Sequence, residues 1–278
     1  MEKLAVIGAG SMAEALISGI VEKKLMNQEK IWVTNRSNRE KLHALQEKYG
    51  VQTTYDMTQM LMDVNVVILD MKPKDVVTAV TQIKPYLKEN VLLISLLAGI
   101  STKSIETISE KSIPIVRAMP NTSAAIGQSA TALAVNSIVS EQQKSMVKKM
   151  FDTVGLTVFV EEAQLNAVTG LSGSGPAYIY YLIEAMEKSA VEIGLESDLA
   201  KQLIVQTLIG AAGMVAHSSK PPMQLRQEVT SPGGTTEAGL KILREHQVQE
   251  AFIHCIKEAT AQSERLGQAL AQNIAEQE

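Results

Sequence analysis

The chain has 278 residues, which is enough for about two domains of ordinary size. Its composition, with 45% hydrophobic and 20% charged residues, excludes a disordered or collagen-like chain. The net charge of −4 gives no strong attraction to nucleic acid or anionic lipid, so we expect no partner of either class.

Short apolar runs alternate with amphipathic segments through the first half of the chain. The predicted strands are residues 4–7, 31–34, 64–69, 91–95, 115–118, 131–135 and 157–160. The predicted helices are residues 11–24, 38–49, 75–87 and 101–109. Because the strands are nearly continuous apolar runs, they favour a parallel sheet covered by helices on both faces. The sequence therefore predicts an α/β fold with a doubly wound sheet over residues 1–160.

The second half of the chain, residues 161–278, contains no convincing strand. Apolar residues recur at helical spacing in segments 179–193 and 204–215, and a last helix is expected over about residues 248–273. This domain alone buries only part of its apolar faces, and the small residues 210–213 permit close helix approach. We expect an all-helical domain that forms a homodimer.

A glycine loop, Gly8-Ala9-Gly10-Ser11-Met12-Ala13, follows the first strand and opens the first helix. Gly8 permits a tight turn, Gly10 lets the backbone approach a pyrophosphate, and Ala13 lets helix and strand pack closely. The free N–H groups of the helix start then face the phosphate. This context favours a Rossmann-type dinucleotide site; the alternative is a plain glycine turn between strand and helix.

The second strand ends in Thr34-Asn35-Arg36-Ser37, without the acidic residue that usually accepts the ribose hydroxyls of NAD. Arg36 can pair with a 2′-phosphate, and Asn35 and Ser37 can donate to it. We therefore expect NADPH to be preferred, with NADH possible. In the alternative interpretation Arg36 is a solvated loop residue.

Two glycine- and hydroxyl-rich motifs stand in the helical half, residues 171–178 and 230–236. In the first, Ser174 lies near a predicted N-cap and Pro176 suits the first position of a helix. The second precedes a predicted helix at residues 237–244. Such turns can hold a carboxylate with backbone donors and hydroxyls. Two ordinary capped loops are the alternative.

Several other kinds of site are missing from the sequence. The four histidines lie outside both motifs, there is no spacing typical of metal ligands, and no nucleophile elbow follows a strand. The longest apolar run, residues 91–100, is half of the roughly 20 residues that span a bilayer. The first residues have no signal-peptide layout, and the single cysteine excludes an internal disulfide. We expect no metal, no membrane segment and a cytoplasmic location.

Two long motifs, Ala167 to Tyr178 and Val229 to Thr236, and four shorter ones, Gly8 to Ala13, Lys72-Pro73, Ala98-Gly99 and Met119 to Thr122, follow one another in the chain. Through them the chain resembles the pyrroline-5-carboxylate reductase family along essentially its whole length. The resemblance implies the last step of proline biosynthesis, in which a nicotinamide cofactor reduces the cyclic imine 1-pyrroline-5-carboxylate to L-proline. It also implies that the helical domains interlock two subunits and that dimers form larger rings, such as a decamer.

The resemblance assigns roles to individual residues. The implied cofactor contacts are Ile7, Gly8, Ala9, Gly10, Ser11, Met12 and Ala13 at the pyrophosphate, Asn35, Arg36 and Ser37 at the adenosine end, and Asp70, Met71, Lys72, Pro73, Leu97, Ala98, Gly99 and Asn121 near the strand ends. The implied substrate contacts are Ser174, Gly175, Val229, Ser231, Gly233, Gly234, Thr235 and Thr236. The Thr236 hydroxyl would bind the ring nitrogen and is the candidate catalytic group.

The chain departs from the family pattern at three positions. Asp70 stands where the family usually has alanine, Met57 where asparagine often contacts the nucleotide, and Ser123 where proline is usual. Two alternatives stay open: a hydroxyacid-dehydrogenase-like oxidoreductase, which would need a base such as Lys72, and a catalytically silent NADP-binding sensor. The intact Ser231 to Thr236 motif argues against the sensor.

Overall fold

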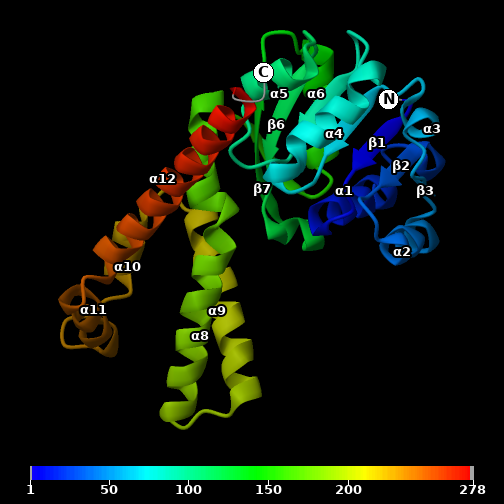
Figure 1. Cartoon of the computed structure of the whole chain (residues 1–278). Coiled ribbons are helices and arrows are strands. Elements are labelled where there is room, and N and C mark those ends of the chain that lie inside the picture. Colours follow the sequence, from blue (N-terminus) through cyan, green and yellow to red (C-terminus); the bar gives the residue numbers. More distant parts are fainter. Residues whose placement is uncertain (1, 276–278) are drawn as a thin grey trace. The chain divides into compact units, whose positions relative to one another are not determined.

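The computed structural model describes residues 2–275, which form two compact units (Figure 1). The first unit combines the chain up to Pro176 with the C-terminal segment from Lys257, and the second comprises Ala177–Ile256. These units reflect packing within one copy of the chain. The predicted division at residue 160 separates a dinucleotide domain from a domain that pairs two subunits, and it stays a prediction.

An eight-stranded sheet in the order β3-β2-β1-β4-β5-β6-β7-β8 is the centre of the first unit. The strands are β1 (Leu4–Ile7), β2 (Ile31–Thr34), β3 (Gln52–Thr53), β4 (Val66–Leu69), β5 (Leu92–Ser95), β6 (Ile115–Met119), β7 (Ser129–Val135) and β8 (Gly155–Phe159). All neighbouring strands pair in parallel except β6 and β7. The prediction of a fully parallel sheet was wrong at β6 and β7, because residues 120–128, which join them, are too few for a crossover connection.

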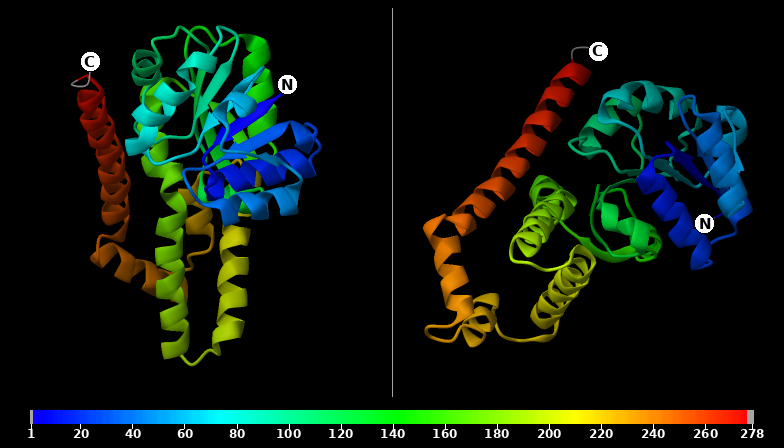
Figure 2. Two further views of the ribbon diagram at one scale, coloured as in Figure 1. Left: turned by 45° about the vertical axis from the view of Figure 1, so that its right-hand side comes forward. Right: turned by 90° about the horizontal axis from the view of Figure 1, so that it is seen from below.

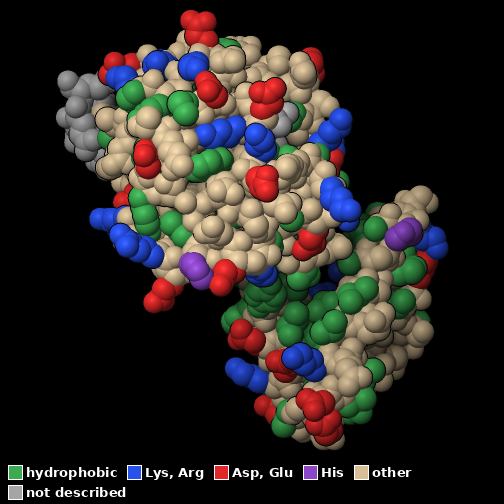
Figure 3. Space-filling model, turned by 90° about the vertical axis from the view of Figure 1, so that its right-hand side faces the viewer, with side chains coloured by type: hydrophobic (Ala, Val, Ile, Leu, Met, Phe, Trp, Pro, Cys, Tyr) green, Lys and Arg blue, Asp and Glu red, His purple; other side chains and the backbone are tan. Residues whose placement is uncertain are grey.

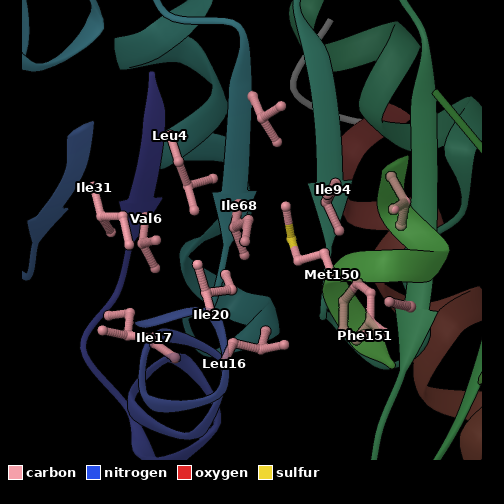
Figure 4. Packing of buried hydrophobic residues seen from close by; sticks show 14 of the residues in the cluster. Leu4, Val6, Leu16, Ile17, Ile20, Ile31, Ile68, Ile94, Met150 and Phe151 are labelled. Carbon is pink, nitrogen blue, oxygen red and sulfur yellow. The ribbon is translucent and has the colours of Figure 1, made fainter. Parts of the chain in front are cut away.

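Helices cover both faces of this sheet, as predicted. Strand residues alternate between two apolar clusters, so that Leu4 and Val6 of β1 face one cluster and Ala5 and Ile7 face the other. Figure 4 shows the first cluster, in which Leu16, Ile17 and Ile20 of α1 lie beneath the strands. The helices of this unit are α1 (Ser11–Glu22), α2 (Arg39–Tyr49), α3 (Met57–Leu61), α4 (Val76–Ile83), α5 (Thr102–Ser109) and α6 (Glu141–Phe151).

Three of these elements, β3, α3 and α6, were not predicted. β3 and α3 are too short to show a hydrophobic period, but the sequence of α6 does contain a helix signal. Ser140 and Gln143 form a reciprocal capping box at its start, and Val147, Met150 and Phe151 make its buried face. The polar first turn of α6, Glu141-Gln142-Gln143-Lys144, concealed that face.

The rest of the described chain is helical, which confirms the prediction for the second half. Its elements are α7 (Leu165–Val168), the π-helical segment Thr169–Gly173, α8 (Gly175–Glu192), α9 (Ser197–His217), α10 (Pro222–Glu228), α11 (Thr235–Glu245) and α12 (Val248–Ala275). The end of α12, which belongs to the first unit, packs beside the loop after β5 (Figure 2). A Cβ added to Gly267 would lie 2.8 Å from the carbonyl oxygen of Gly99, so this contact needs a glycine.

An ionic cluster links α1 to α2 and predicts an acid-sensitive contribution to stability. The Glu14 carboxylate accepts hydrogen bonds from Lys41, from Lys48 at 3.0 Å and from the Tyr49 hydroxyl at 3.1 Å. The hydrogen bond from Lys41, followed by that from Lys48, lowers the pKa of Glu14 from 4.5 to about 2. A carboxyl with a lowered pKa in the folded state stabilises above its unfolded pKa and loses that effect as pH falls.

We expect Glu14→Gln to lower the free energy of unfolding at pH 7 by about 1 kcal/mol, since these groups are partly solvated. The difference from the wild type should shrink between pH 4.5 and 2. Urea unfolding at pH 7, 4 and 3 measures it. A difference that stays constant across these pH values contradicts the assignment.

Candidate functional site

The loop between β1 and α1 leaves backbone donors at a helix N-terminus. Gly8 has φ +116°, and its N–H donates to the Thr34 carbonyl at 2.9 Å, so the chain turns sharply at the end of β1. Gly10 is the N-cap of α1 and offers no side chain to the helix. Among the described residues, the N–H groups of Ser11 and Met12 have no hydrogen-bond partner. These donors suit an anionic group, as the glycine loop predicted.

The Asp70 carboxyl lies at this same helix N-terminus. Its Oδ2 atom accepts a hydrogen bond from the Ala13 N–H at 3.0 Å, and the carbonyl of Asp70 backs directly onto Gly8. Burial raises the pKa of Asp70, although hydrogen bonding from the N–H groups of Ala13 and Gly10 acts in the opposite direction. The sequence placed Asp70 near the cofactor but did not predict this contact.

A cleft of about 440 Å³ lies beside the loop, at the carboxyl ends of β1, β2 and β4. It brings together Ile7, Gly8, Asn35, Arg36 and Met71, which the sequence analysis assigned to the cofactor. This edge of the sheet, where the strand order reverses between β1 and β4, is the usual ligand position in doubly wound folds. The cleft is also lined by Thr34, Tyr55, Met57, Asp75, Thr78, Ala79 and Gln82.

The end of this cleft that the sequence analysis assigned to the adenosine carries several polar groups, some of which are already hydrogen-bonded. Arg36 is exposed and lies 4.0 Å from the Asp75 carboxylate, so its guanidinium remains accessible to a phosphate. Asn35 donates to the Asn38 carbonyl and accepts from the Tyr55 hydroxyl at 3.0 Å. The sequence analysis missed Tyr55, because a single tyrosine in a polar segment carries no motif. Ser37 is exposed.

The remaining predicted cofactor residues occupy different environments. Lys72 is exposed and precedes the short 3-10 turn Pro73–Asp75. Leu97 is buried in the second apolar cluster, Ala98 is exposed, and Gly99 packs against α12. Their contacts with a cofactor stay predictions, and for Leu97 only the backbone is free to make one.

Asn121 holds the π-helical segment in place. Its Nδ2 donates to the Ser172 carbonyl at 3.0 Å, and its Oδ1 accepts from the Ser123 N–H at 3.2 Å. In an α-helix the Ser172 carbonyl would accept from residue 176, but Pro176 has no N–H to donate. Asn121 therefore satisfies a carbonyl that the proline leaves without its helical partner. Its predicted contact with the cofactor stays a prediction.

The first glycine motif lies between two stretches of helical backbone and lacks the N-cap that we predicted. Helical backbone runs from Leu165 through the π segment into α8, and the Ser174 N–H donates to the Thr169 carbonyl at 2.9 Å. Ser174 has helical dihedral angles and is no N-cap, so that part of the prediction was wrong. α8 does begin at Gly175 with Pro176 as its second residue, close to the predicted helix start. Substrate contacts of Ser174 and Gly175 stay predictions.

The second glycine motif does form a helix N-terminus. Gly234 is the N-cap of α11, and the N–H groups of Thr235, Thr236 and Glu237 have no hydrogen-bond partner in the described part of the chain. The Gly233 N–H donates to Glu237 Oε2 at 2.8 Å, so a substrate carboxylate would have to displace that side chain to use it. Val229, Ser231 and Thr236 are exposed. This arrangement suits an anion beside an available hydroxyl.

The sequence-predicted residues thus fall on two separate units. The cofactor residues and Ser174-Gly175 belong to the first, whereas residues 229–236 belong to the second. Within 2–275, no group of three or more histidine, cysteine, aspartate or glutamate side chains has the arrangement of a metal site.

Known proteins similar to this chain cover almost all of it. Residues 162–266 match the family described as pyrroline-5-carboxylate reductase dimerisation, and residues 3–99 match NADP oxidoreductase coenzyme F420-dependent. Pyrroline-5-carboxylate reductase 2 of Bacillus subtilis is 44% identical over 271 residues, which cover 98% of this chain and 97% of the relative. The chain belongs to the pyrroline-5-carboxylate reductase family.

Solved structures of this family share the fold over nearly the full length. The reductase of Coxiella burnetii has a TM-score of 0.87 at 38% identity and covers 95% of this chain and 98% of its own. That of Plasmodium falciparum, described with NADP bound, has a TM-score of 0.88 at 28% identity and covers 96% and 99%. The comparisons support the resemblance seen in the sequence, and the two alternative functions have no support from them. The first unit binds a pyridine nucleotide.

The second unit exposes large apolar side chains along α8 and α9, in the region that matches the dimerisation family. On α8 they include Ile179, Tyr181 and Val191, and on α9 Leu203, Ile209 and Met214, all at least 40% exposed. Figure 3 shows hydrophobic side chains gathered on the surface of this helical part. α9 is also long and apolar enough to cross a membrane by length and composition alone, and 11% of its apolar window is buried within the described chain, so most of that window is free to pack against a partner. Apolar faces of this extent mark an interface, and the chain forms oligomers through this region.

Proposed function

We propose that this chain reduces the C=N bond of 1-pyrroline-5-carboxylate to give L-proline, the last step of proline biosynthesis, with a reduced nicotinamide dinucleotide. The near full-length identity of 44% to a reductase of that name carries the proposal. The geometry supports it, because each unit offers a helix N-terminus with free backbone donors, one beside the dinucleotide cleft and one beside a threonine hydroxyl.

The residues of the first unit fit the cofactor. The Ser11 and Met12 N–H groups are available to a diphosphate, and the bare Gly8 and Gly10 backbone leaves room for close approach. When bound, the cofactor supplies a hydride to the imine carbon. The protein has to bind, orient and exclude water around the two molecules.

On the substrate side, we assign the carboxylate to Ser231 and to the backbone of residues 233–236, with Val229, Ser174 and Gly175 as further contacts. The Thr236 hydroxyl would hydrogen-bond the ring nitrogen. A protonated iminium is already electrophilic, so the site needs an oriented donor or acceptor at nitrogen and no strong acid of its own. A hydroxyacid substrate would instead require a base to remove a hydroxyl proton.

NADPH is the proposed cofactor, with NADH as a weaker one. Arg36 supports this preference, because its exposed guanidinium lies at the rim of the cleft and its contact with Asp75 is at the long limit of an ion pair. Such an exposed contact contributes little free energy, so a 2′-phosphate can compete with Asp75 for the arginine.

Arg36→Ala should weaken NADPH binding roughly tenfold and leave NADH binding nearly unchanged, because only NADPH carries the 2′-phosphate. Fluorescence titration with each cofactor measures both dissociation constants. Lys23→Ala removes the same charge beyond the far end of α1 and serves as the control. Equal weakening of both cofactors by Arg36→Ala rejects the assignment.

We further propose a cytoplasmic homodimer formed through residues 161–278, with dimers assembling into a larger ring such as a decamer. The exposed apolar faces of α8 and α9 support this assembly, since a second copy of the chain can cover them. Light scattering of the purified chain gives the number of subunits.

Incubation with NADPH and 1-pyrroline-5-carboxylate tests the function directly. The absorbance of NADPH at about 340 nm should fall, and proline should accumulate in an amount equal to the NADPH consumed. Binding of NADPH without its oxidation would support the silent sensor and overturn the proposal.

A further inference from the structure

The Asp70 carboxyl occupies part of the site at which the proposed function places a diphosphate. It accepts from the third N–H of α1, that of Ala13, at 3.0 Å. A Cβ added to Gly10 would lie 3.0 Å from Asp70 Oδ2, so the carboxyl reaches the N-cap residue itself. The protein therefore supplies an anionic group of its own to the N-terminus of α1.

This carboxyl and a dinucleotide diphosphate make conflicting demands on the same helix end. Each negative charge gains from the free N–H groups and the helix dipole, but the two repel each other at short range in a half-buried place. Alanine, which the family usually has at this position, would present no such conflict. A bound proton on Asp70 removes the repulsion and still leaves one oxygen to accept from Ala13.

The charged groups on the surrounding elements do not neutralise Asp70. On α1, Glu14 is held by Lys41 and Lys48. The turn after Asp70 carries Lys72, whose side chain is exposed. At the end of β2, Arg36 is exposed, and the carboxylate that it lies near is that of Asp75, 4.0 Å away. β1 and the segment from 96 to 101 after β5 carry no ionisable side chain.

We propose that Asp70 takes up one proton from solvent when the dinucleotide binds, so that cofactor affinity falls as pH rises. The inference rests on the proposed function, which places the diphosphate at α1. The proton adds to one Asp70 oxygen, and the neutral carboxyl can then donate to an anionic oxygen. Burial already raises the pKa of Asp70 in the free protein, and an adjacent diphosphate would raise it further. Between these two pKa values, affinity falls by up to about tenfold per pH unit, the slope for one proton.

NADH is the probe for the test, because it has the diphosphate but lacks the 2′-phosphate, whose own titration near neutral pH would interfere. Its dissociation constant is measured by fluorescence from pH 6 to 9. Calorimetry in two buffers with different heats of ionisation counts the protons taken up. For the wild type we expect weaker binding at higher pH and close to one proton taken up in the sloping range.

Asp70→Asn keeps an oxygen that can accept from the Ala13 N–H but cannot ionise. This variant should bind NADH more tightly than the wild type at high pH, with an affinity that changes less than about twofold across the range and no buffer-dependent heat. Asp63→Asn makes the same change before the other end of β4, at an exposed residue, and should behave as the wild type.

A wild-type affinity that does not change with pH overturns the inference, as does an Asp70→Asn variant that keeps the wild-type slope. Either result leaves the proposed function standing, because NADH still binds. If the wild type binds no NADH at any pH, the assignment of the dinucleotide site fails, and the inference fails with it.

Discussion

Gly8→Ala should strongly weaken dinucleotide binding and destabilise the first unit. Gly8 has φ +116°, and a Cβ added there would lie 1.7 Å from the carbonyl oxygen of Asp70 and 2.5 Å from its carbonyl carbon. Both atoms are backbone, so no side-chain rotation relieves the overlap. The loop must move away from β4, which costs about 3 kcal/mol or more when strain and lost packing are combined. That movement also displaces the donors of Ser11 and Met12.

NADH titration and thermal unfolding measure the two effects. We expect the affinity of Gly8→Ala to fall at least about 100-fold, because the phosphate contacts depend on the shape of the loop. Gly127→Ala is the matched control: Gly127 also has positive φ, at +70°, but an added Cβ there meets no atom within 4 Å. It should cost only about 1 kcal/mol of stability and leave binding unchanged. A Gly8→Ala variant that binds NADH as well as the control contradicts this account.

The predictable parts of the molecule are those that local sequence determines. The four-residue apolar run at Leu4–Ile7 with Gly8 after it leaves little choice but a buried strand and a sharp turn, and the structure has both. The antiparallel β7 was harder, because its apolar sequence suits either direction and only the short connection decides.

The rule that glycines and a proline mark a helix start misses the π segment for a physical reason. Pro176 and the glycines before it are typical of a helix start, and α8 does begin at Gly175, but the backbone before it is already helical, and Asn121 donates to the Ser172 carbonyl from 51 residues away in sequence. Arg117 in β6 likewise depends on a partner that is distant in sequence. Its charge is buried in an apolar strand, and its partner Glu162, at 3.0 Å, comes from a segment that no pattern connects to it.

The candidate site also has parts that local sequence predicts and parts that it does not. The glycine loop and Arg36 could be placed from their order after β1 and β2, since the carboxyl ends of parallel strands meet at one edge. The contact of Asp70 with α1 could not, because the sequence gives no direction for a side chain at a strand end. That direction decides whether the Asp70 carboxyl reaches the N–H groups of α1 or points away from them.

Thr236→Ala should lower kcat roughly 10- to 100-fold with a smaller change in KM, because a hydrogen bond to the ring nitrogen matters most as the charge at that atom changes. Thr236 is the second residue of α11, its side chain is exposed, and within residues 2–275 its hydroxyl has no hydrogen-bond partner. The hydroxyl therefore contributes little to the fold, and its loss should change stability by less than about 0.5 kcal/mol.

Steady-state kinetics of Thr236→Ser and Thr236→Ala separate the hydroxyl from the methyl group. Serine keeps the oxygen, so this variant should retain most of the wild-type kcat, whereas alanine loses it. NADPH affinity should be the same for both, since the cofactor residues lie on the other unit of the chain. If the serine variant is as slow as the alanine variant, the loss of the methyl group and its packing explains the lower kcat. If alanine is as fast as the wild type, the ring nitrogen has another partner and the role assigned to Thr236 is wrong.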